Sequence, residues 1–330
     1  MTVHTRRRAA VAAVAALPLL TLGCGGDTEP GASGGGGGAG DVATVTLGLI
    51  PIIDVAPVYL GQEQGFFEEQ RIELELSAGQ GGAAIVPGIV SGSLDVGFTN
   101  NLSLVIASAA GLPLQVVTSG VDSTGDPAKD PFTIVTADDA ITRPADLAGK
   151  RVAVNTVNAI GDTVVRASVE ADGGDPDSIE FVELAFPNMA AAVTAGDVDA
   201  AWLVEPFVTI GAPQGLRVLT TPLLDFTDIP VEVSTYATSA TFAAEDEDVL
   251  ARFTTAMEQS LEYAQANPDA VRAILPTYLD MPAELAAQLR LPEWNTTASR
   301  ETFELFAELA EADGLLTGEP DLDTLLAHVD

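Results

Sequence analysis

The sequence predicts an α/β protein of two lobes, with a cleft between the lobes and a helical C-terminal part. Three observations lead to this prediction: a β-α-β-α-β pattern occurs twice, extended segments follow each copy, and helical periodicity dominates the end of the chain. Strands that alternate with helices favour parallel sheets with right-handed crossovers. Two copies of the pattern therefore predict two sheets, one in each lobe.

The residues ahead of the predicted folded part have the order of an export signal. Three arginines at positions 6–8 precede an apolar run over residues 9–22, and Gly23 comes before the single cysteine, Cys24. The apolar run is shorter than the roughly 20 residues that cross a bilayer. We expect residues 1–23 to be a signal peptide; a twin-arginine signal, and an ordinary signal with a chance cysteine, remain alternatives.

A glycine-rich segment follows the cysteine. Residues 24–41 consist mainly of Gly, Ser, Ala and acidic residues, and a segment of this composition cannot bury enough apolar surface to fold. We therefore expect a flexible linker that carries a folded part over residues 42–330.

The formal net charge of the chain is −34 at pH 7. Such an acidic surface repels phosphate backbones and anionic lipid headgroups. Nucleic acid is therefore excluded as an expected partner, and so is direct binding of the folded part to anionic lipid.

Both copies of the repeated pattern contain strand, helix, strand, helix and strand in this order. They end with similar phrases, Gly92–Phe98 and Gly196–Trp202, in which a glycine stops a helix where a left-handed residue is favoured. The predicted elements are 45–50, 57–67, 72–76, 83–90 and 95–98 in the first copy, and 151–155, 161–171, 178–182, 187–194 and 199–202 in the second.

Further extended segments predict where the chain passes between the lobes. Residues 114–118, 132–136 and 231–237 are apolar or alternating, and an acidic, turn-rich loop separates the first two. We expect the first lobe to comprise about 42–130 and 236–330, and the second lobe about 131–235.

The C-terminal part has helical periodicity. Residues 246–265 place apolar side chains on one face, and a second helix around 303–310 stops at Gly314. We interpret the aromatic residues of these helices as core.

Twelve residues are candidates for ligand binding because they follow predicted strands. In open α/β sheets, ligands bind outside the carboxyl ends of the strands. The candidates are Asp54, Gln80, Gly81, Gly82, Thr99, Asn100 and Asn101 in the first copy, and Asn155, Thr156, Asn158, Asn188 and Glu205 in the second.

The chemistry of these loops is mixed. Several of them precede helices, whose free N–H groups favour a carboxylate, a sulfonate or another oxyanion. No Lys or Arg falls in the loops, whereas Asp54 and Glu205 add negative charge. A neutral polar ligand, or one with both an amino and an acidic group, fits best. Helix capping by Asp54, a plain helix start at Glu205 and turn roles for the asparagines are the alternatives.

Five ordered phrases resemble the substrate-binding proteins of ABC importers. Specifically, they resemble the nitrate/sulfonate/taurine and thiamine-precursor (NMT1/THI5-like) group, within the type II periplasmic binding protein superfamily. The phrases are Pro57–Phe67, Val90–Gly97, Ala110–Leu114, Ala145–Val154 and Ala195–Phe207.

The resemblance implies a fold that closes on one small polar solute and then delivers it to an ABC transporter permease. It implies no catalysis, no cofactor and no metal, and a monomer is expected. The nitrate/sulfonate/taurine class is the first expectation for the solute. A thiamine-pyrimidine precursor or another aminopyrimidine is the alternative ligand, and a ligand-sensing lipoprotein without a transport role is the alternative function.

The junction Leu22–Cys24 is similar to the lipobox of bacterial lipoproteins, although Thr21 departs from the usual aliphatic residue. This resemblance implies cleavage before Cys24 and lipid attachment to it, with palmitate among the acyl chains. The expected location is the outer face of the cytoplasmic membrane.

The group also resembles fungal thiamine-pyrimidine synthases, which rely on histidine and on cysteine-rich segments. The only histidines here are His4 and His328, near the two ends, and Cys24 lies in the predicted junction. The body therefore lacks the usual nucleophiles and general bases, and it cannot form a zinc site of the His or Cys type. We expect a binding protein and no enzyme.

Overall fold

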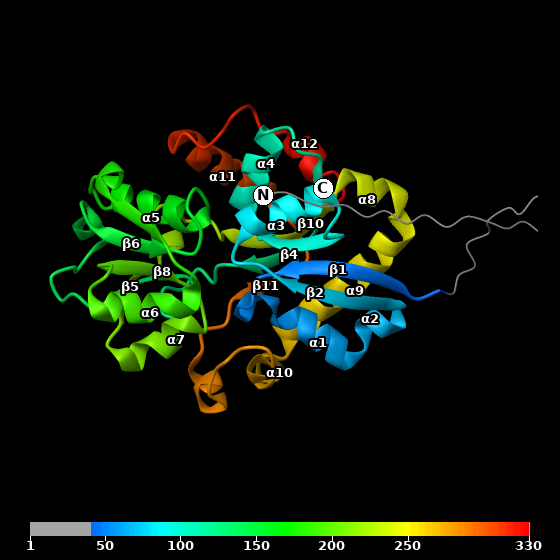
Figure 1. Ribbon diagram of the computed structural model, residues 1–330, viewed down its shortest axis with the longest axis horizontal. Helices are drawn as coiled ribbons and strands as arrows, with labels where there is room; N and C mark the ends of the chain where they lie inside the picture. Colours follow the sequence, from blue (N-terminus) through cyan, green and yellow to red (C-terminus); the bar gives the residue numbers. More distant parts are fainter. Residues whose placement is uncertain (1–40, 330) are drawn as a thin grey trace, which may run out of the picture. The chain divides into compact units, whose positions relative to one another are not determined.

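Two mixed β-sheets form the framework of residues 41–329, which the computed structural model describes (Figure 1). The first sheet has the strand order β11-β4-β10-β3-β1-β2, and the second has the order β7-β6-β8-β5-β9. We refer to each sheet, with the helices that pack on it, as the first or second lobe. This arrangement confirms the predicted fold class.

Parallel pairing dominates the half of the first sheet that the first copy forms. Strand β1 pairs in parallel with β2 and β3, and β10 inserts antiparallel between β3 and β4. Alternation places Val45, Leu47 and Leu49 of β1 in the core. The strands are β1 (Ala43–Leu49), β2 (Ile72–Ala78), β3 (Val96–Asn100), β4 (Leu114–Asp122), β10 (Glu232–Ser239) and β11 (Glu293–Trp294).

The second sheet repeats this plan. Strand β6 pairs in parallel with β7 and β8, and β5 pairs antiparallel with β8 and β9. Its strands are β5 (Thr133–Thr136), β6 (Arg151–Val154), β7 (Glu180–Glu183), β8 (Ala200–Leu203) and β9 (Arg217–Thr220).

The chain passes between the sheets twice. It leaves the first sheet after Asp122 and enters the second at Thr133. It returns before Glu232, because the whole of β10 belongs to the first sheet. The expected return point near residue 235 therefore lies inside β10, which begins within one residue of the extended segment at 231–237 and pairs on both sides within the first sheet.

Helices cover both sheets. Gly92 and Gly196 end α3 and α6 with φ of 72° and 77°, the left-handed conformation that the two similar phrases predicted. The helices of the first lobe are α1 (Ala56–Gln64), α2 (Phe66–Glu69), α3 (Gly82–Ser91), α4 (Asn101–Ala109), α8 (Ala240–Glu245), α9 (Glu247–Ala266), α10 (Pro268–Ile274), α11 (Arg300–Ala312) and α12 (Leu322–Leu325); those of the second are α5 (Ile160–Ala171), α6 (Phe186–Ala195) and α7 (Phe207–Gly211).

The C-terminal helices complete the first lobe. Phe253 on α9, and Phe303 and Phe306 on α11, are fully buried, as expected for core residues. Helix α9 packs on α1, and α11 packs on α4. The aromatic residues of these helices therefore hold the first lobe together.

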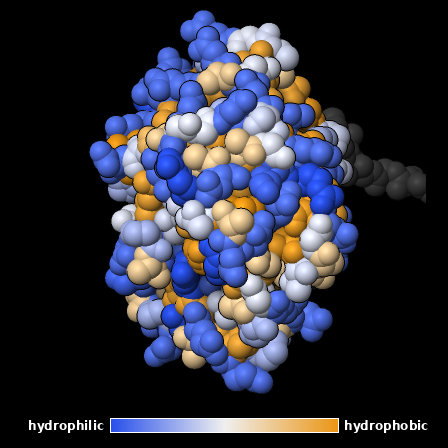
Figure 2. Space-filling view, turned by 90° about the vertical axis from the view of Figure 1, so that its left-hand side faces the viewer, coloured by the Kyte–Doolittle hydropathy of each residue, from blue (hydrophilic) through white to orange (hydrophobic). Residues whose placement is uncertain are grey.

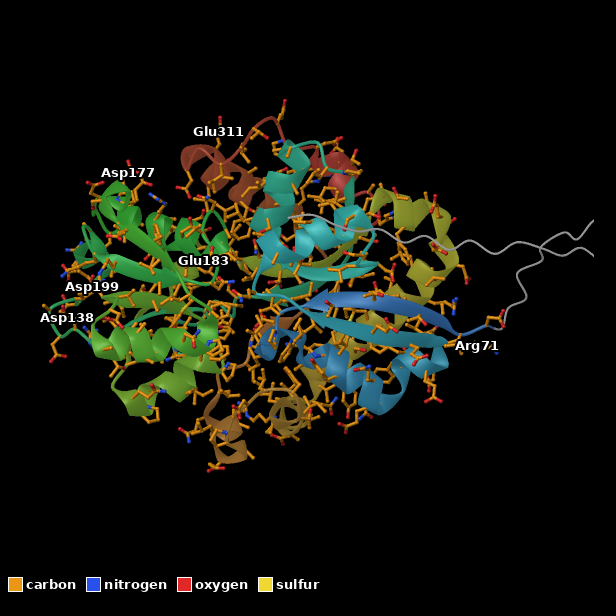
Figure 3. The ribbon with its side chains drawn as sticks, in the orientation of Figure 1. Arg71, Asp138, Asp177, Glu183, Asp199 and Glu311 are labelled. Carbon is orange, nitrogen blue, oxygen red and sulfur yellow. The ribbon has the colours of Figure 1, made fainter. Side chains whose placement is uncertain are left out.

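The surface agrees with the acidic composition. The face shown in Figure 2 is predominantly hydrophilic, with scattered apolar residues. Asp138, Asp177 and Asp199 lie on the side of the second lobe that faces away from the first (Figure 3). Among residues 41–329, no helix is long and apolar enough to cross a membrane. The predicted signal peptide and Cys24, and all of the linker except Asp41, lie outside the described residues.

Candidate functional site

The loops at the carboxyl ends of the parallel strands bring the two lobes into contact. The backbone N–H of Ile53, after β1, donates to the carbonyl of Glu205, after β8, at 3.2 Å. The side-chain Nδ2 of Asn155, after β6, donates to the carbonyl of Gln80, after β2, at 2.9 Å. The predicted loops thus meet where the two sheets face each other.

Gly81 marks the closest approach between the lobes. Its φ of 175° is extended backbone, so the missing side chain matters more than conformational freedom. A Cβ at this position would lie 2.8 Å from Asn155 Nδ2 and 2.9 Å from Thr156 Oγ1. Any larger residue would therefore require the side chains of Asn155 and Thr156, which belong to the second lobe, to move.

Gly82 begins α3 and is surrounded by polar groups of its own lobe. A Cβ at Gly82 would lie 2.6 Å from both Asn100 Nδ2 and Ser103 Oγ, and it would also overlap the hydroxyl of Thr99. Asn100 caps α4, because its Oδ1 accepts a hydrogen bond from Ser103 N at 2.9 Å. Two helix N-termini, those of α3 and α4, therefore lie beside these polar groups.

Several polar atoms at this junction are buried without a hydrogen-bond partner among the described residues. Buried polar atoms are nearly always hydrogen-bonded, and an unsatisfied one costs about 1–3 kcal/mol. The unpartnered atoms include Asp54 Oδ1, Thr99 Oγ1, Asn155 Oδ1, Thr156 Oγ1 and the hydroxyl of Tyr236. Both lobes contribute, so a polar solute between them would satisfy donors and acceptors from each side.

Asp54 is an unpaired acid in this group. Its side chain is 1% exposed, and burial raises its pKa to about 7, with Asp130 adding a smaller effect in the same direction. Its charge also acts on Tyr236 and Tyr278, whose pKa values are raised mainly by burial. Val55 is the N-cap of α1 and gives no side-chain cap, so Asp54 does not cap that helix.

Glu205 has a different environment. It is fully buried, and its carboxylate accepts hydrogen bonds from Thr209 N at 3.0 Å, Thr209 Oγ1 at 2.8 Å and Arg290 N at 3.2 Å. Burial raises the pKa of Glu205, and these hydrogen bonds oppose the shift. The side chain therefore joins α7 to the segment before β11, while its backbone carbonyl contacts the first lobe.

Three predicted asparagines lie in different surroundings. Asn101 is fully buried and donates from Nδ2 to the carbonyl of Glu232 at 2.9 Å. Asn158 and Asn188 are exposed, and Asn158 has a left-handed φ of 55°. The structure thus brings Asn101 into the buried polar group but leaves the side chains of Asn158 and Asn188 at the surface.

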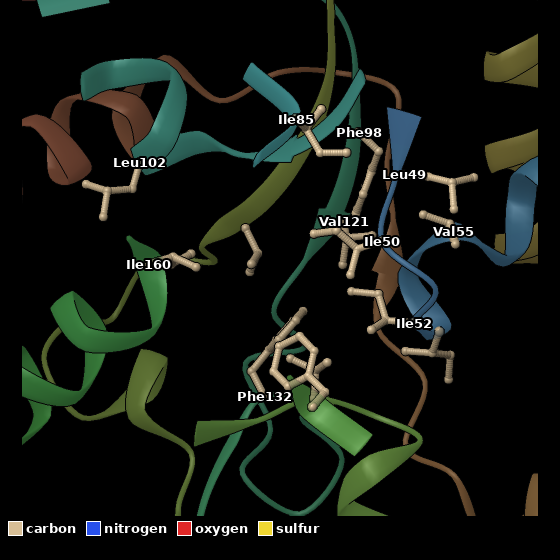
Figure 4. Close-up of a cluster of buried hydrophobic side chains, with 14 of the residues drawn as sticks. Leu49, Ile50, Ile52, Val55, Ile85, Phe98, Leu102, Val121, Phe132 and Ile160 are labelled. Carbon is tan, nitrogen blue, oxygen red and sulfur yellow. The ribbon is translucent and has the colours of Figure 1, made fainter. Parts of the chain in front are cut away.

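Apolar side chains surround the polar junction. Leu102 of the first lobe and Ile160 of the second belong to one buried cluster with Ile52 and Phe132 (Figure 4). Tyr59 and Tyr278 stack nearby with ring centroids 3.9 Å apart, and the Tyr278 hydroxyl donates to the carbonyl of Ile52 at 3.1 Å.

Comparison with known proteins agrees with this geometry. Residues 52–271 match the family described as NMT1/THI5 like. The chain belongs to the NMT1/THI5-like family. The resemblance that the sequence indicated is thereby confirmed.

Curated relatives of this NMT1/THI5-like protein differ in what their names describe. It is 27% identical over 155 residues to a taurine-binding periplasmic protein of Escherichia coli K12, over 47% of this chain and 46% of that protein. It is 24% identical over 263 residues to the 4-amino-5-hydroxymethyl-2-methylpyrimidine phosphate synthase of Aspergillus parasiticus, and the match covers 76% of this chain and 70% of that protein. It is 22% identical over 227 residues to a formylaminopyrimidine-binding protein of Halalkalibacterium halodurans, and the match covers 68% of this chain and 66% of that protein.

Solved structures show the same fold. The alkanesulfonate-binding protein SsuA from Xanthomonas axonopodis pv. citri, bound to MOPS, superimposes with a TM-score of 0.72 at 20% identity. The alignment covers 87% of this chain and 99% of that chain. At this identity the likeness establishes the periplasmic binding protein fold.

Sequence reasoning missed several residues of the NMT1/THI5-like chain whose polar atoms are buried without a partner among the described residues. Tyr236 and Thr235 come from β10, and Ser119 and Asp122 come from β4, two strands that carry no family phrase beyond Leu114. In the sequence, these residues are recognisable only as polar positions within otherwise apolar extended segments. Within residues 41–329, no group of three or more His, Cys, Asp or Glu residues is arranged to hold a metal ion.

Proposed function

We propose that this NMT1/THI5-like protein is an exported solute-binding protein that captures a small polar molecule between its lobes and delivers it to an ABC import permease. The observation that carries the proposal is the set of buried, unpartnered polar atoms that both lobes contribute at their junction. A solute that contacts both lobes favours the arrangement in which they touch, which is a population shift.

A sulfonate of the alkanesulfonate or taurine class is the proposed solute. The N-termini of α3 and α4 lie beside Thr99 and Asn100, and free helix N–H groups stabilise an oxyanion. Relatives named for taurine and for alkanesulfonate support this class. We assign contact with the solute to Asp54, to residues 80–82 and 99–101, and to Asn155 and Thr156.

An aminopyrimidine is the second candidate solute. The unpaired acid Asp54 would accept hydrogen bonds from an amino group, and the rings of Tyr59 and Tyr278, the second of which feels the charge of Asp54, stack on each other. The formylaminopyrimidine-binding relative supports this candidate. An enzyme related to the pyrimidine phosphate synthase would instead convert such a compound, and product analysis would reveal it.

A panel of ligands tests the function. Residues 40–330 form a compact unit, and thermal unfolding of this unit should be followed with alkanesulfonates, taurine, nitrate, aminopyrimidines and small carboxylates. At a concentration of 100 Kd, a ligand stabilises the folded state by about 2.7 kcal/mol. A panel without any stabilising compound would contradict the proposal.

The membrane anchor is a separate part of the proposal. We assign lipid attachment to Cys24 and a location on the outer face of the cytoplasmic membrane, which keeps the protein near its permease. Replacement of Cys24 by Ser should release the protein from membranes. Co-purification with a permease complex would favour transport over a role as a ligand sensor.

A further inference from the structure

A row of buried hydroxyl groups crosses three neighbouring strands of the first sheet. Thr99 on β3 lies directly opposite Thr235 on β10, and Thr235 lies opposite Ser119 on β4. Residues that face each other across antiparallel strands place their side chains on the same side of the sheet. All three residues are fully buried, and none of their hydroxyl groups has a hydrogen-bond partner among the described residues.

The row ends at a carboxyl group. The Ser119 side chain lies next to Glu232, the first residue of β10, which is 1% exposed. Glu232 Oε2 accepts a hydrogen bond from Ser299 N at 2.7 Å, whereas its Oε1 has no partner. We refer to Thr99, Thr235, Ser119 and Glu232 as the buried polar tract.

A second acid and an amide lie at the same end of the tract. Asp122 is the direct partner of Glu232 across β4 and β10, and its Oδ1 is also unpartnered. Asn101 donates to the backbone carbonyl of Glu232, while its own Oδ1 is buried and unpartnered. None of the ion pairs within residues 41–329 involves Asp122 or Glu232. The unpartnered oxygens of these three residues are all acceptors, and neither carboxylate is paired with a cation among the described residues.

The opposite end of the tract favours an anion. Thr99 lies against Gly82, at the start of the ten-residue helix α3. Thr99 on β3 and Glu232 on β10 lie on neighbouring strands about 4.8 Å apart, and Glu232 is three residues along β10 from Thr235, the partner of Thr99, which adds about 10 Å along the strand. The tract therefore offers contacts for an anion near Thr99 and for a cation near Glu232.

We propose that the buried polar tract is the solute-contacting floor of the first lobe, and that Glu232 makes the protein prefer solutes that carry a protonated nitrogen opposite their oxyanion. The inference rests on the proposed function and narrows it to amino-sulfonates and related zwitterions. Nitrate and simple alkanesulfonates then lack one of the two groups that the tract recognises.

Matched pairs of ligands test this inference in the purified protein. Taurine and ethanesulfonate differ only in the ammonium group, and so do 3-aminopropanesulfonate and propanesulfonate. Titration calorimetry should show at least tenfold tighter binding of the amino compound in each pair, as expected for a hydrogen bond to a charged group.

The variant Glu232→Gln preserves the shape of the side chain and removes its charge. It should weaken binding of the amino compounds by about 10- to 100-fold and change binding of the simple sulfonates by less than about threefold. Glu75→Gln is the matched control, because Glu75 lies on β2 of the same sheet with an exposed side chain. That variant should bind all four compounds as the wild type does.

A structural role for Glu232 gives a different result. In that case Glu232→Gln lowers the melting temperature and weakens both members of each pair equally, which would overturn the inference. If Glu232→Gln does not fold, Ser119→Ala and Thr235→Val remove neighbouring hydroxyls instead, and unchanged affinities in both variants would overturn it as well.

The outcomes also separate the inference from the proposed function. Equal binding of amino and simple sulfonates by the wild type overturns the inference and leaves the solute-binding function intact. Binding of no compound in the wider panel overturns both.

Discussion

Gly81 lies in extended backbone, where any residue fits the backbone angles, yet its side of the junction has no room for a methyl group. The nearest atoms, Asn155 Nδ2 and Thr156 Oγ1, belong to the other lobe. The requirement for glycine therefore arises from the contact between the lobes and not from the fold of the first lobe. A substitution here separates the energetics of closing from those of folding.

Gly81→Ala should lower the affinity for the solute about tenfold, equivalent to about 1.4 kcal/mol. The new methyl group pushes Asn155 and Thr156 away, which favours the open arrangement. Unfolding by urea in the absence of solute should change by less than about 1 kcal/mol, because the open first lobe accommodates the methyl group. Calorimetric titration and urea unfolding together measure both effects.

Gly65→Ala is the matched control for this prediction. Gly65 has a left-handed φ of 84° and open space around it, so alanine strains the backbone by about 1–2 kcal/mol without touching the second lobe. Its stability should fall while its affinity stays unchanged. Wild-type affinity in Gly81→Ala would show that the solute-bound protein does not use this contact.

At the scale of elements, a further contact between the lobes joins α5 to α11. Thr163 on α5 donates from Oγ1 to Asp313 Oδ2 at 2.7 Å, just beyond the C-terminus of α11. Thr163 is 1% exposed, and burial raises the pKa of Asp313 although this hydrogen bond lowers it. The two residues lie 150 positions apart in the sequence, and their hydrogen bond joins the lobes at α5.

Thr163→Val should reduce the affinity for the solute about three- to tenfold, because the closed arrangement loses one hydrogen bond to a carboxylate. Small-angle scattering of the solute-free protein should show a larger radius of gyration than for the wild type. Thr254→Val is the control, since the Thr254 hydroxyl bonds to Leu250 within α9 of the first lobe alone. An equal loss of affinity in both variants would refute the assignment.

Local pattern predicted the elements of the two copies, because alternation and helical periodicity act within each segment. Helix α4 escaped prediction since seven of its nine residues are buried, which leaves no polar face to set a period. Strand β11 has only two residues and exists through its pairing with β4. Such elements are defined by tertiary contacts that a local pattern does not contain.

The same distinction applies to the site. The loops after β1, β2, β3, β6 and β8 were predictable, because the carboxyl edge of a parallel sheet follows from the pattern. The polar residues of β10 were not, because its place between β3 and β4 depends on antiparallel pairing with both strands, with register shifts against β4. Asn158 shows the converse: its left-handed φ explains an asparagine at that position without any ligand.

At the scale of the whole molecule, buried acids combine with a net charge of −34. Burial raises the pKa of Asp54 to about 7, of Asp122 to about 6 and of Glu232 to about 7. Exposed acids with lowered pKa values, such as Asp146 and Asp172, change the stability of the protein only at pH values near and below their usual pKa of 3.8. The buried acids therefore dominate the pH dependence between about pH 4 and pH 7.

The solute-free protein should be more stable at pH 5 than at pH 8. Each buried acid binds its proton more tightly in the folded state than in the unfolded state, so folding is favoured at low pH. This contribution is lost as the pH rises from the unfolded pKa near 4 through the folded values of about 6 to 7. Melting temperatures measured by calorimetry should accordingly fall by a few degrees across this range.

Surface repulsion has the same sign, so the measurement needs 0.5 M NaCl, at which repulsion between exposed charges is screened beyond a few ångströms. Glu232→Gln separates the two causes further, because glutamine does not titrate and the surface keeps its other charges. The variant should show a shallower fall of melting temperature with pH than the wild type in the same salt. A wild-type melting temperature that stays level or rises from pH 5 to pH 8 would mean that the buried acids are already neutralised by each other or remain hydrated in the folded protein.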